Sequence, residues 1–470
     1  MTEASWISIL PPLLAIVLAI STRQVLLSLF LGVWLGYWLI PGGNPLSALA
    51  ESMEGLVEVL SDAGDTKVIM FTLMIGGLIA ILEACGGVRG FVNWLEKRNW
   101  VNRPGQAQWL SLLIGVVIFI ESNITVLVAG SVCRPLFDKM KIAREKLAYL
   151  IDSTSAPICI LIPLNAWGAF NLGLLEGTGV ENSLELFLAS IPLNFYAISA
   201  LLLAVSSVAF NWNFDGMGKA MERTRNGELH WPGSTPVVDE ELLSPPLDPS
   251  VKPRAVNMLL PIIVMVVGMP VGLWITGDGN LMKGSGSTSV LWAVGMALLT
   301  AATLVLTQRQ MSLDKLNTTF VRGAGGVLPL AMILLLALAL GDVTGKLKTA
   351  EFVSAFIGDA IPVAMLPALI FLVSGAIAFS VGSSWGTFAI MLPIAVAVAG
   401  DQGMALAPVV AAVLSGGIFG DHASPISDTT IVSSMASACD HIDHVKTQLP
   451  YALIAGGIAF TGFVITGMTM

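Results

Sequence analysis

Apolar segments long enough to cross a lipid bilayer recur from one end of this chain to the other. A membrane-spanning helix needs roughly 17–25 predominantly apolar residues. Of the 470 residues, 55% are hydrophobic and only 12% are charged, whereas soluble domains carry about 25% charged residues. The strands of an outer-membrane barrel alternate apolar and polar residues, and these segments do not. The sequence therefore predicts an all-α polytopic membrane protein.

Composition also limits the expected partners. No basic cluster is interleaved with aromatic residues, so we expect no nucleic-acid partner, and we expect no cofactor. Residues 1–5 lack the basic region of a signal peptide, so residues 6–20 are predicted to form a retained first helix. Four cysteines without CxxC spacing are predicted to be small buried residues rather than disulfides or metal ligands: Cys85, Cys133, Cys159 and Cys439.

The basic residues of the loops predict a direction for each helix, because positive charge gathers on the cytoplasmic side of a membrane. The turn at Arg23 is predicted to lie inside, and the acidic link 41–65 outside. By the same rule the first half contains helices at 6–20, 25–40, 68–82 and 184–210, an amphipathic stretch at 88–100 and an outside loop at 165–183.

Two interruptions stand out in the first half. The apolar run at about 108–133 is broken by Glu121-Ser122-Asn123, and both of its flanks are basic. A single crossing cannot have two inside ends, so we predict a re-entrant hairpin with its tip at 121–123. Polar, non-helical backbone at membrane depth is tolerated only where protein or a wet cavity surrounds it. A broken helix follows at about 147–164, interrupted by residues 152–157.

The second half repeats this order from the opposite side of the membrane, after a polar, proline-rich cytoplasmic linker at 211–254. We predict helices at 256–275, 290–306, 325–340 and 449–466, an inside loop at 309–322, an amphipathic stretch at 351–361, a second hairpin at about 366–400 broken by 382–387, a second broken helix at about 407–434, and a cytoplasmic loop at 439–446. Residues 1–210 and 255–470 would thus form an inverted repeat, the architecture of secondary transporters.

Three aspartates lie at the predicted breaks, Asp152, Asp421 and Asp428. A carboxylate at the bilayer centre costs about 2.5–3.5 kcal/mol, so such residues face a cavity and mark ion or proton paths. Carboxylates, hydroxyls and freed carbonyls are the oxygen ligands that Na⁺ needs. We predict sodium binding at these aspartates. Burial raises a carboxyl pKa and a bound cation lowers it, so one of them can exchange H⁺ for Na⁺. Helix capping is the alternative, above all for Asp428.

Further candidate cation- and proton-binding residues lie beside the aspartates and at the hairpin tips: Glu121, Ser122, Asn123, Ser155, Ser383, Ser384, Thr387, His422, Ser424, Ser427 and Thr429. Capping explains the serines nearly as well. His422 either carries a proton at physiological pH or only makes a hydrogen bond. His441 and His444 have the spacing of a metal pair, but we expect them in a solvated or gating cytoplasmic segment.

Two stretches, GDHASPISDTT at 420–430 and CDHIDHVKTQLPY at 439–451, resemble the signature of the NhaC-type Na⁺/H⁺ antiporter family. That family belongs to a larger ion-transporter superfamily that includes Na⁺-coupled carboxylate carriers. The resemblance implies a homodimer with a scaffold domain and a mobile domain built from both hairpins and both broken helices. It also implies elevator-type alternating access.

Two transport hypotheses remain. In the first, which we favour, a Na⁺/H⁺ antiporter of the cytoplasmic membrane binds Na⁺ and H⁺ competitively at the aspartates. In the second, a Na⁺-coupled symporter or exchanger carries an amino acid or carboxylate, with Trp385, Gly382 and Gly386 in a larger cavity. Backbone N–H groups at a helix start would suit a carboxylate. A third hypothesis, an intramembrane aspartyl protease, needs Tyr-Asp and Gly-x-Gly-Asp patterns, and neither is intact here.

Overall fold

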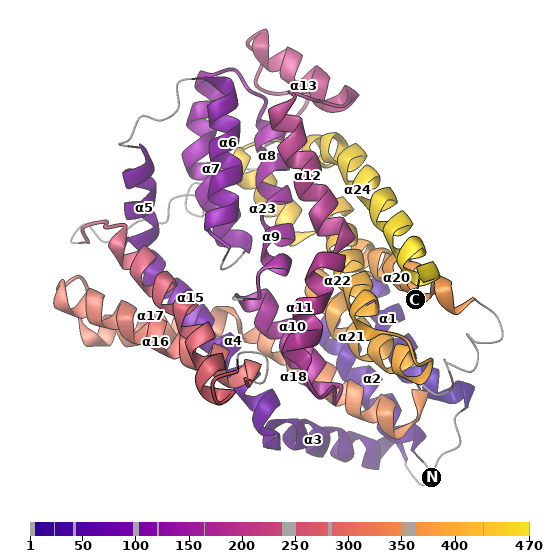
Figure 1. Ribbon diagram of the computed structural model, residues 1–470. Coiled ribbons are helices and arrows are strands. Elements are labelled where there is room, and N and C mark those ends of the chain that lie inside the picture. Colours follow the sequence, from indigo (N-terminus) through magenta and orange to yellow (C-terminus); the bar gives the residue numbers. More distant parts are fainter. Residues whose placement is uncertain are drawn as a thin grey trace.

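The computed structural model describes most of the chain and shows helices without strands in that part (Figure 1). The described residues are 5–22, 24–40, 44–96, 103–119, 122–163, 165–236, 251–280, 284–349, 352, 362–425 and 427–469. The predicted amphipathic stretch at 351–361 therefore lies almost entirely outside the described residues, and so does Glu121.

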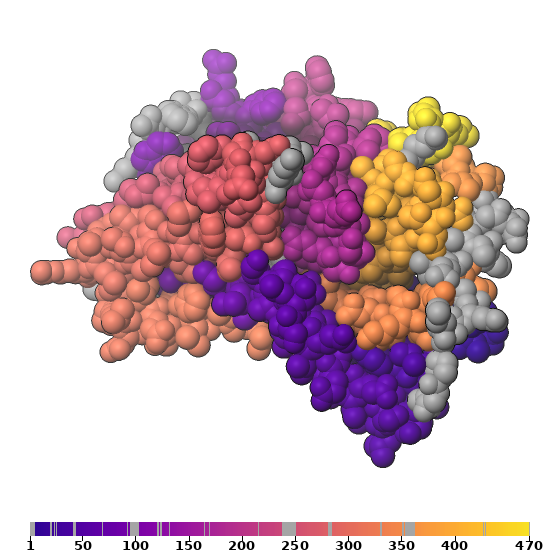
Figure 2. Space-filling view, turned by 60° about the horizontal axis from the view of Figure 1, so that its bottom comes forward, coloured from indigo at the N-terminus to yellow at the C-terminus, as the bar shows by residue number. Residues whose placement is uncertain are grey.

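The chain opens with a 3-10 helix, Trp6–Ile9, followed by α1 (Leu10–Thr22), α2 (Val25–Leu39), α3 (Pro45–Ser61), α4 (Ala63–Ala84) and α5 (Gly87–Glu96). The predicted link at 41–65 is wrong, because α3 fills most of it. Asn44 caps this helix by accepting hydrogen bonds from the backbone N–H groups of Leu46 and Ser47. The apolar side chains of Leu46 and Val57 stay exposed on the ridge that α3 forms in Figure 2.

The rest of the first half consists of α6 (Pro104–Val117), α7 (Ser122–Lys139), α8 (Arg144–Ser153), α9 (Ala156–Leu161), α10 (Ala166–Gly177), α11 (Ser183–Ser190), α12 (Phe195–Ala209) and α13 (Asp215–Arg225). α6 and α7 lie side by side in Figure 1. The predicted outside loop at 165–183 is wrong: Asn165 caps α10 by accepting from the Gly168 N–H, and Trp167 and Phe170 bury its apolar face.

The second half consists of α15 (Val256–Thr276), α16 (Gly286–Thr307), α17 (Leu313–Gly326), α18 (Leu328–Lys346), α20 (Leu366–Val381), α21 (Ser384–Asp401), α22 (Leu406–Ala423), α23 (Asp428–Ser437) and α24 (His441–Thr469). Two predicted loops are helical instead. Ser312 caps α17 where the loop 309–322 was expected, and Asp440 begins α24 inside the expected loop 439–446 by accepting from the Ile442 and Asp443 N–H groups.

Within the described residues, seven helices are long and apolar enough to cross a membrane, or up to ten if each bent helix pair counts as one span. The protein is an integral, multi-pass membrane protein. α22 is the most enclosed of these spans, with 83% of its apolar window buried. It lies among α12, α20, α21 and α24 near the centre of Figure 1.

Glycines allow α20 and α22 to approach each other closely. A Cβ atom on Gly416 would lie 2.4 Å from the carbonyl oxygen of Phe371, and one on Gly420 would lie 2.2 Å from that of Gly375. Small residues of this kind let helix backbones meet inside membranes. The contact fixes the end of α22, and with it Asp421, against the end of α20.

Candidate functional site

The site is built where helices stop inside the bundle. α8 gives way to α9 at residues 154–155, α20 to α21 at 382–383, and α22 to α23 at 424–427. Gly382 ends α20 in the left-handed conformation, with φ at 73°, which a residue with a side chain rarely adopts. Ser424 donates to the carbonyl oxygen of Phe379 at 2.7 Å, which joins the break after α22 to α20.

Asp421 lies in the last turn of α22 and is buried. Its Oδ2 accepts a hydrogen bond from the Ser384 hydroxyl at 2.8 Å, and its Oδ1 accepts one from the Ser427 hydroxyl. The Thr429 hydroxyl lies 3.0 Å from that of Ser427. Four predicted site residues, from two different breaks, therefore meet at this carboxylate.

Asp152 is a second buried carboxylate, 1% exposed, just before the break between α8 and α9. Its Oδ2 accepts from Nε2 of Gln448 at 2.6 Å and, less closely, from the Thr430 hydroxyl at 3.4 Å. Its Oδ1 has no hydrogen-bond partner among the described residues. Buried polar atoms are nearly always paired, so an unpaired carboxylate oxygen at this depth needs a functional explanation.

Two imidazoles face this carboxylate. Nε2 of His422 lies 3.7 Å from Oδ2 of Asp152, and Nε2 of His444 lies 4.0 Å from the same atom. Nδ1 of His422 lies 2.8 Å from the hydroxyl of Tyr196, on α12. His422 is the neighbour of Asp421 in sequence, but its side chain serves the other aspartate.

One short segment contacts both aspartates. Ser427 donates to Asp421, and Thr430, three residues later, donates to Asp152. The break after α22 therefore forms a wall that the two carboxylates share. Asp428 lies between Ser427 and Thr430 in the sequence, but its side chain is not among those that the structure describes, and neither is that of Asn123.

His441 and His444 are not in a solvated segment, so that part of the prediction is wrong, and the gating alternative stays a prediction. Both lie in the first turn of α24, and His444 is fully buried. The Ser434 hydroxyl is 3.0 Å from Nδ1 of His441 and 2.9 Å from Nδ1 of His444, and Nε2 of His441 is 2.6 Å from the Pro425 carbonyl oxygen. Within the described part of the chain, no group of three His, Cys, Asp or Glu residues is placed to hold a metal ion.

Other predicted residues make hydrogen bonds typical of helix ends. Ser155 donates to the backbone carbonyl of Asp152 at 2.9 Å, and Thr387 donates to that of Ser383 at 3.0 Å. The Ser383 hydroxyl accepts from the N–H of Gly386 at 3.5 Å and caps α21. Ser122 is buried in the first turn of α7.

Trp385, in the first turn of α21, belongs to an aromatic cluster with α10. Its ring centroid lies 4.7 Å from that of Trp167 and 4.9 Å from that of Phe170. Nε1 of Trp167 and Oδ1 of Asn171 are buried without a hydrogen-bond partner among the described residues. One donor, on the tryptophan that contacts Trp385, and one acceptor four residues later on α10 are thus left unpaired among the described residues.

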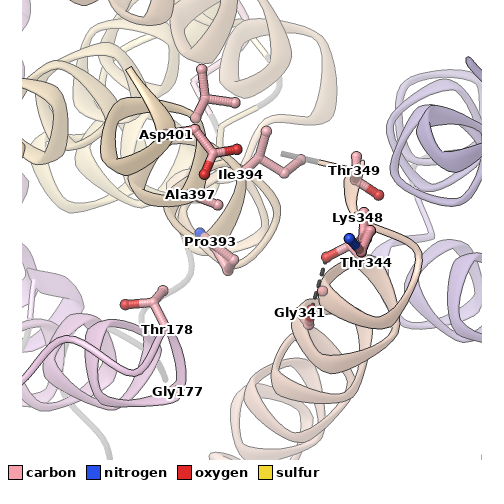
Figure 3. A pocket seen from close by; sticks show the side chains of 12 residues that line it. Gly177, Thr178, Gly341, Thr344, Lys348, Thr349, Pro393, Ile394, Ala397 and Asp401 are labelled. Carbon is pink, nitrogen blue, oxygen red and sulfur yellow. Dashed lines mark hydrogen bonds between the residues drawn. The ribbon is translucent and has the colours of Figure 1, made fainter. Parts of the chain in front are cut away.

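A cavity of about 300 Å³ lies at another place, among the C-terminal parts of α10, α18 and α21. Figure 3 shows Asp401 of α21 on one side of it, and on the other Thr344 of α18 with Lys348, just after that helix. The residues that line it include none of the predicted site residues, so this cavity is separate from Asp152 and Asp421.

The first turn of α8, two turns before Asp152, is held by contacts with the linker at 211–254. Arg223 forms an ion pair with Glu145, with Nη1 2.8 Å from Oε1 and Nη2 3.0 Å from Oε2, and its guanidinium stacks over Trp231. Nη1 of Arg144 lies 3.3 Å from Nε2 of His230. Burial, and next the neighbouring Arg144 guanidinium, lower the pKa of His230.

Sequence reasoning missed several residues of the Asp152 centre, namely Gln448, Thr430, Tyr196 and Ser434. Gln448 had a signal, because it follows His441 and His444 at the i, i+3, i+7 spacing of one helix face. That spacing has meaning only if α24 begins at 441. Nothing in the sequence places Tyr196 beside His422.

The match to known proteins agrees with this geometry. Residues 158–468 match the Na⁺/H⁺ antiporter family. An uncharacterized protein of Haemophilus influenzae (strain ATCC 51907 / DSM 11121 / KW20 / Rd) is 32% identical over 486 aligned residues, which cover 98% of this chain and 91% of that protein. The crystal structure of the YdaH transporter of Alcanivorax borkumensis shares the fold, with a TM-score of 0.57, 12% identity and 97% of each chain covered.

Two further relatives match over shorter stretches. The arginine/ornithine antiporter ArcD of Halobacterium salinarum is 27% identical over 221 residues, which are 47% of this chain and 44% of that one. The malate-2H(+)/Na(+)-lactate antiporter of Bacillus subtilis is 36% identical over 86 residues, 18% of each chain.

Buried carboxylates at helix breaks inside a multi-pass bundle define a membrane transporter rather than an enzyme. The chain belongs to the Na⁺/H⁺ antiporter family, and the resemblance of its two signature stretches to that family is confirmed.

Proposed function

We propose that the protein is a secondary antiporter of the cytoplasmic membrane that exchanges Na⁺ for H⁺ by alternating access. One observation carries the proposal. Asp152 is buried with one carboxylate oxygen unpaired, and among the described residues no lysine or arginine forms an ion pair with it. An uncompensated buried charge is strongly unfavourable. A proton and a sodium ion each neutralise it, and only one can do so at a time.

Asp421 supports the same function with different ligands. The hydroxyls of Ser384 and Ser427 donate hydrogen bonds to its carboxylate, so their oxygens lie beside it and could join it around a cation. Hydroxyl and carboxylate oxygens are hard ligands suited to Na⁺. We propose that the breaks move as part of one transport domain against a scaffold in a homodimer, in an elevator-type cycle between two inverted-repeat halves. The linker at 211–254, whose lysine and arginine residues mark an inside segment, would face the cytoplasm.

Flux into proteoliposomes tests this proposal. An imposed pH gradient should drive ²²Na⁺ uptake without any added organic solute. Asp152→Asn and Asp421→Asn should each reduce the initial rate at least about tenfold, the loss that ~1.4 kcal/mol of binding free energy produces. Asp314→Asn, at an exposed carboxylate in the first turn of α17, is the matched control and should keep the rate of the parent protein. Sodium uptake that ignores the pH gradient refutes the exchange.

A second candidate function is exchange of a small organic solute coupled to Na⁺ or H⁺. Two unpaired polar atoms favour this second function, Nε1 of Trp167, whose ring contacts that of Trp385, and Oδ1 of Asn171. A small polar solute has groups that would pair with both. Two relatives also support an organic substrate, because one is named an arginine/ornithine antiporter and the other a malate-2H(+)/Na(+)-lactate antiporter.

The two functions separate in one assay. If a Na⁺ gradient concentrates an amino acid or a carboxylate, and a pH gradient alone moves no Na⁺, the second function replaces the first. Trp167→Phe keeps an aromatic ring and removes the indole N–H. It should weaken solute uptake if the second function holds, and it should leave Na⁺/H⁺ exchange unchanged if the first one holds.

A further inference from the structure

The amide of Gln448 has a fixed orientation. Its Nε2 lies 2.6 Å from Oδ2 of Asp152 and 2.8 Å from the backbone carbonyl oxygen of His422, and its Oε1 lies 2.8 Å from Nε2 of His444. Carboxylate and carbonyl oxygens only accept hydrogen bonds, so the NH₂ group must face them. Gln448 therefore donates both of its amide hydrogens, one to the Asp152 carboxylate at the end of α8 and one to the His422 carbonyl at the end of α22.

Those two oxygens are of the kind that binds a cation. The His422 carbonyl belongs to the last turn of α22, where the helix leaves it without an intrahelical donor. Carbonyls freed by helix breaks, together with carboxylates, coordinate Na⁺ in transporters. Nε2 of Gln448 lies within 2.8 Å of both atoms. The amide thus stands at the position that a cation shared by Asp152 and His422 would take.

We propose that the Gln448 amide is a place-holder for the transported cation. Rotation of the amide by half a turn, together with a retreat of the side chain from the position that the cation takes, would replace the NH₂ group by Oε1 as a third oxygen ligand. A monovalent cation would then be held by the Asp152 carboxylate, the His422 carbonyl and Gln448. The unpaired Oδ1 of Asp152 is available as a further ligand. The cargo role of this site rests on the proposed function, but the cation site itself does not.

The surroundings permit this rotation. After it, the NH₂ group faces Nε2 of His444, which accepts a hydrogen bond when the imidazole carries its proton on Nδ1. Nδ1 lies 2.9 Å from the Ser434 hydroxyl, whose oxygen accepts that proton's hydrogen bond. Before the rotation Oε1 accepts from Nε2–H of the neutral imidazole, so the rotation is accompanied by a change of tautomer, in which Nε2 releases its proton and Nδ1 takes one up. The imidazole is neutral in both states. Asp152 supplies one negative charge, so a monovalent cation neutralises the site and a divalent one would leave an excess positive charge.

Thermal unfolding of the purified protein in detergent at mildly alkaline pH tests the proposal, with NaCl compared against choline chloride. Gln448→Glu keeps the length of the side chain, removes both competing N–H donors and adds a charged oxygen ligand. The upward shift of Tm in NaCl should be larger in Gln448→Glu than in the parent protein, corresponding to Na⁺ binding about tenfold tighter.

Gln310→Glu is the matched control. Gln310 is also a buried glutamine whose Nε2 bonds to a backbone carbonyl, that of Lys252, and to a second oxygen, Oε1 of Gln308. It lies in another network, between α15 and α16, and its substitution should leave the Na⁺-dependent shift of the parent protein unchanged. Combining Gln448→Glu with Asp152→Asn should abolish the gain. An equal shift in Gln448→Glu and the parent, or a gain that survives Asp152→Asn, overturns the proposal.

A second measurement does not depend on the stability of any variant. Crystals of the parent protein soaked in Tl⁺, a monovalent cation with strong anomalous scattering, should show a peak in contact with Asp152 and the His422 carbonyl. A peak elsewhere only, or none, contradicts the site. Proteoliposome flux separates the cation site from the transport function. If Na⁺ stabilises the protein through Gln448 but no Na⁺/H⁺ exchange occurs, the cation site is supported and the proposed function is refuted.

Discussion

The linker helix α13 is joined to α8 by a buried ion pair, and loss of this pair should measurably lower the free energy of unfolding. Arg223 is 4% exposed and Glu145 3%, and both guanidinium–carboxylate distances are at most 3.0 Å. Arg223→Ala leaves the Glu145 carboxylate buried without its partner. Breaking a buried pair in this way costs about 3–5 kcal/mol. The variant also loses the hydrogen bonds from Arg223 to the backbone carbonyls of Glu228 and Leu229.

Chemical unfolding monitored in detergent measures this loss, and a double substitution identifies its cause. Replacing both partners, as Glu145→Gln with Arg223→Met, removes the orphaned charge. Apolar or neutral substitutes for buried pairs are often close to neutral, so the double variant should be more stable than Arg223→Ala alone. The reasoning is refuted if Arg223→Ala costs less than about 1 kcal/mol, the value of an exposed pair, or if the double variant is the less stable of the two.

Two other predictions concern packing and pH. Gly420→Ala places a methyl group 2.2 Å from the Gly375 carbonyl oxygen and should lower the free energy of unfolding by about 1–3 kcal/mol or more. The control is Gly457→Ala, where the added methyl group meets nothing within 4 Å, and it should unfold like the parent protein. Equal stabilities of the two variants in chemical unfolding would contradict the packing argument. His230 has a lowered pKa in the folded protein, so the unfolded chain binds more protons, and the contact with Arg144 should be lost as pH falls below about 6.5. The protection of the backbone amides at residues 228–235, taken relative to their intrinsic exchange rate at each pH, should then decrease as pH falls. His230→Gln should remove that decrease, and a pH-dependent protection that survives this substitution excludes His230 as its source.

The membrane class, the helix breaks and the Asp421 centre could be predicted because they depend on local sequence. Polar residues inside apolar runs have few explanations in a bilayer. Ser384 and Ser427 were predicted site residues, and both reach Asp421. The family signature at 420–430 placed the motif correctly in a transporter.

The helices α3, α10 and α17 were missed for one physical reason. Their segments were interpreted by the sign of their charges, which indicates a side of the membrane and carries no information on helix formation. Their capping residues, Asn44, Asn165 and Ser312, are visible in the sequence. The buried apolar residues of α10 follow a helical period that charge counting does not register.

The way the Asp152 centre is assembled was beyond sequence reasoning because its members come from five helices. Tyr196 on α12, His422 on α22, Thr430 on α23, and His444 and Gln448 on α24 converge on α8 only through tertiary packing. Spacing predicts which residues share a helix face. It does not predict which faces meet.

The short stretch from Ser427 to Thr430 has a thermodynamic consequence. One end holds Asp421 and the other holds Asp152, so any displacement that relaxes one hydroxyl is transmitted along three peptide units to the other. If both carboxylates bind Na⁺, as proposed, occupancy at the two is linked, and linkage is reciprocal: the factor by which filling one site changes the affinity of the second is the factor by which filling the second changes the affinity of the first. Under that proposal the Na⁺ dependence of transport should depart from a simple hyperbola, and a substitution at one aspartate should change the apparent affinity at the other.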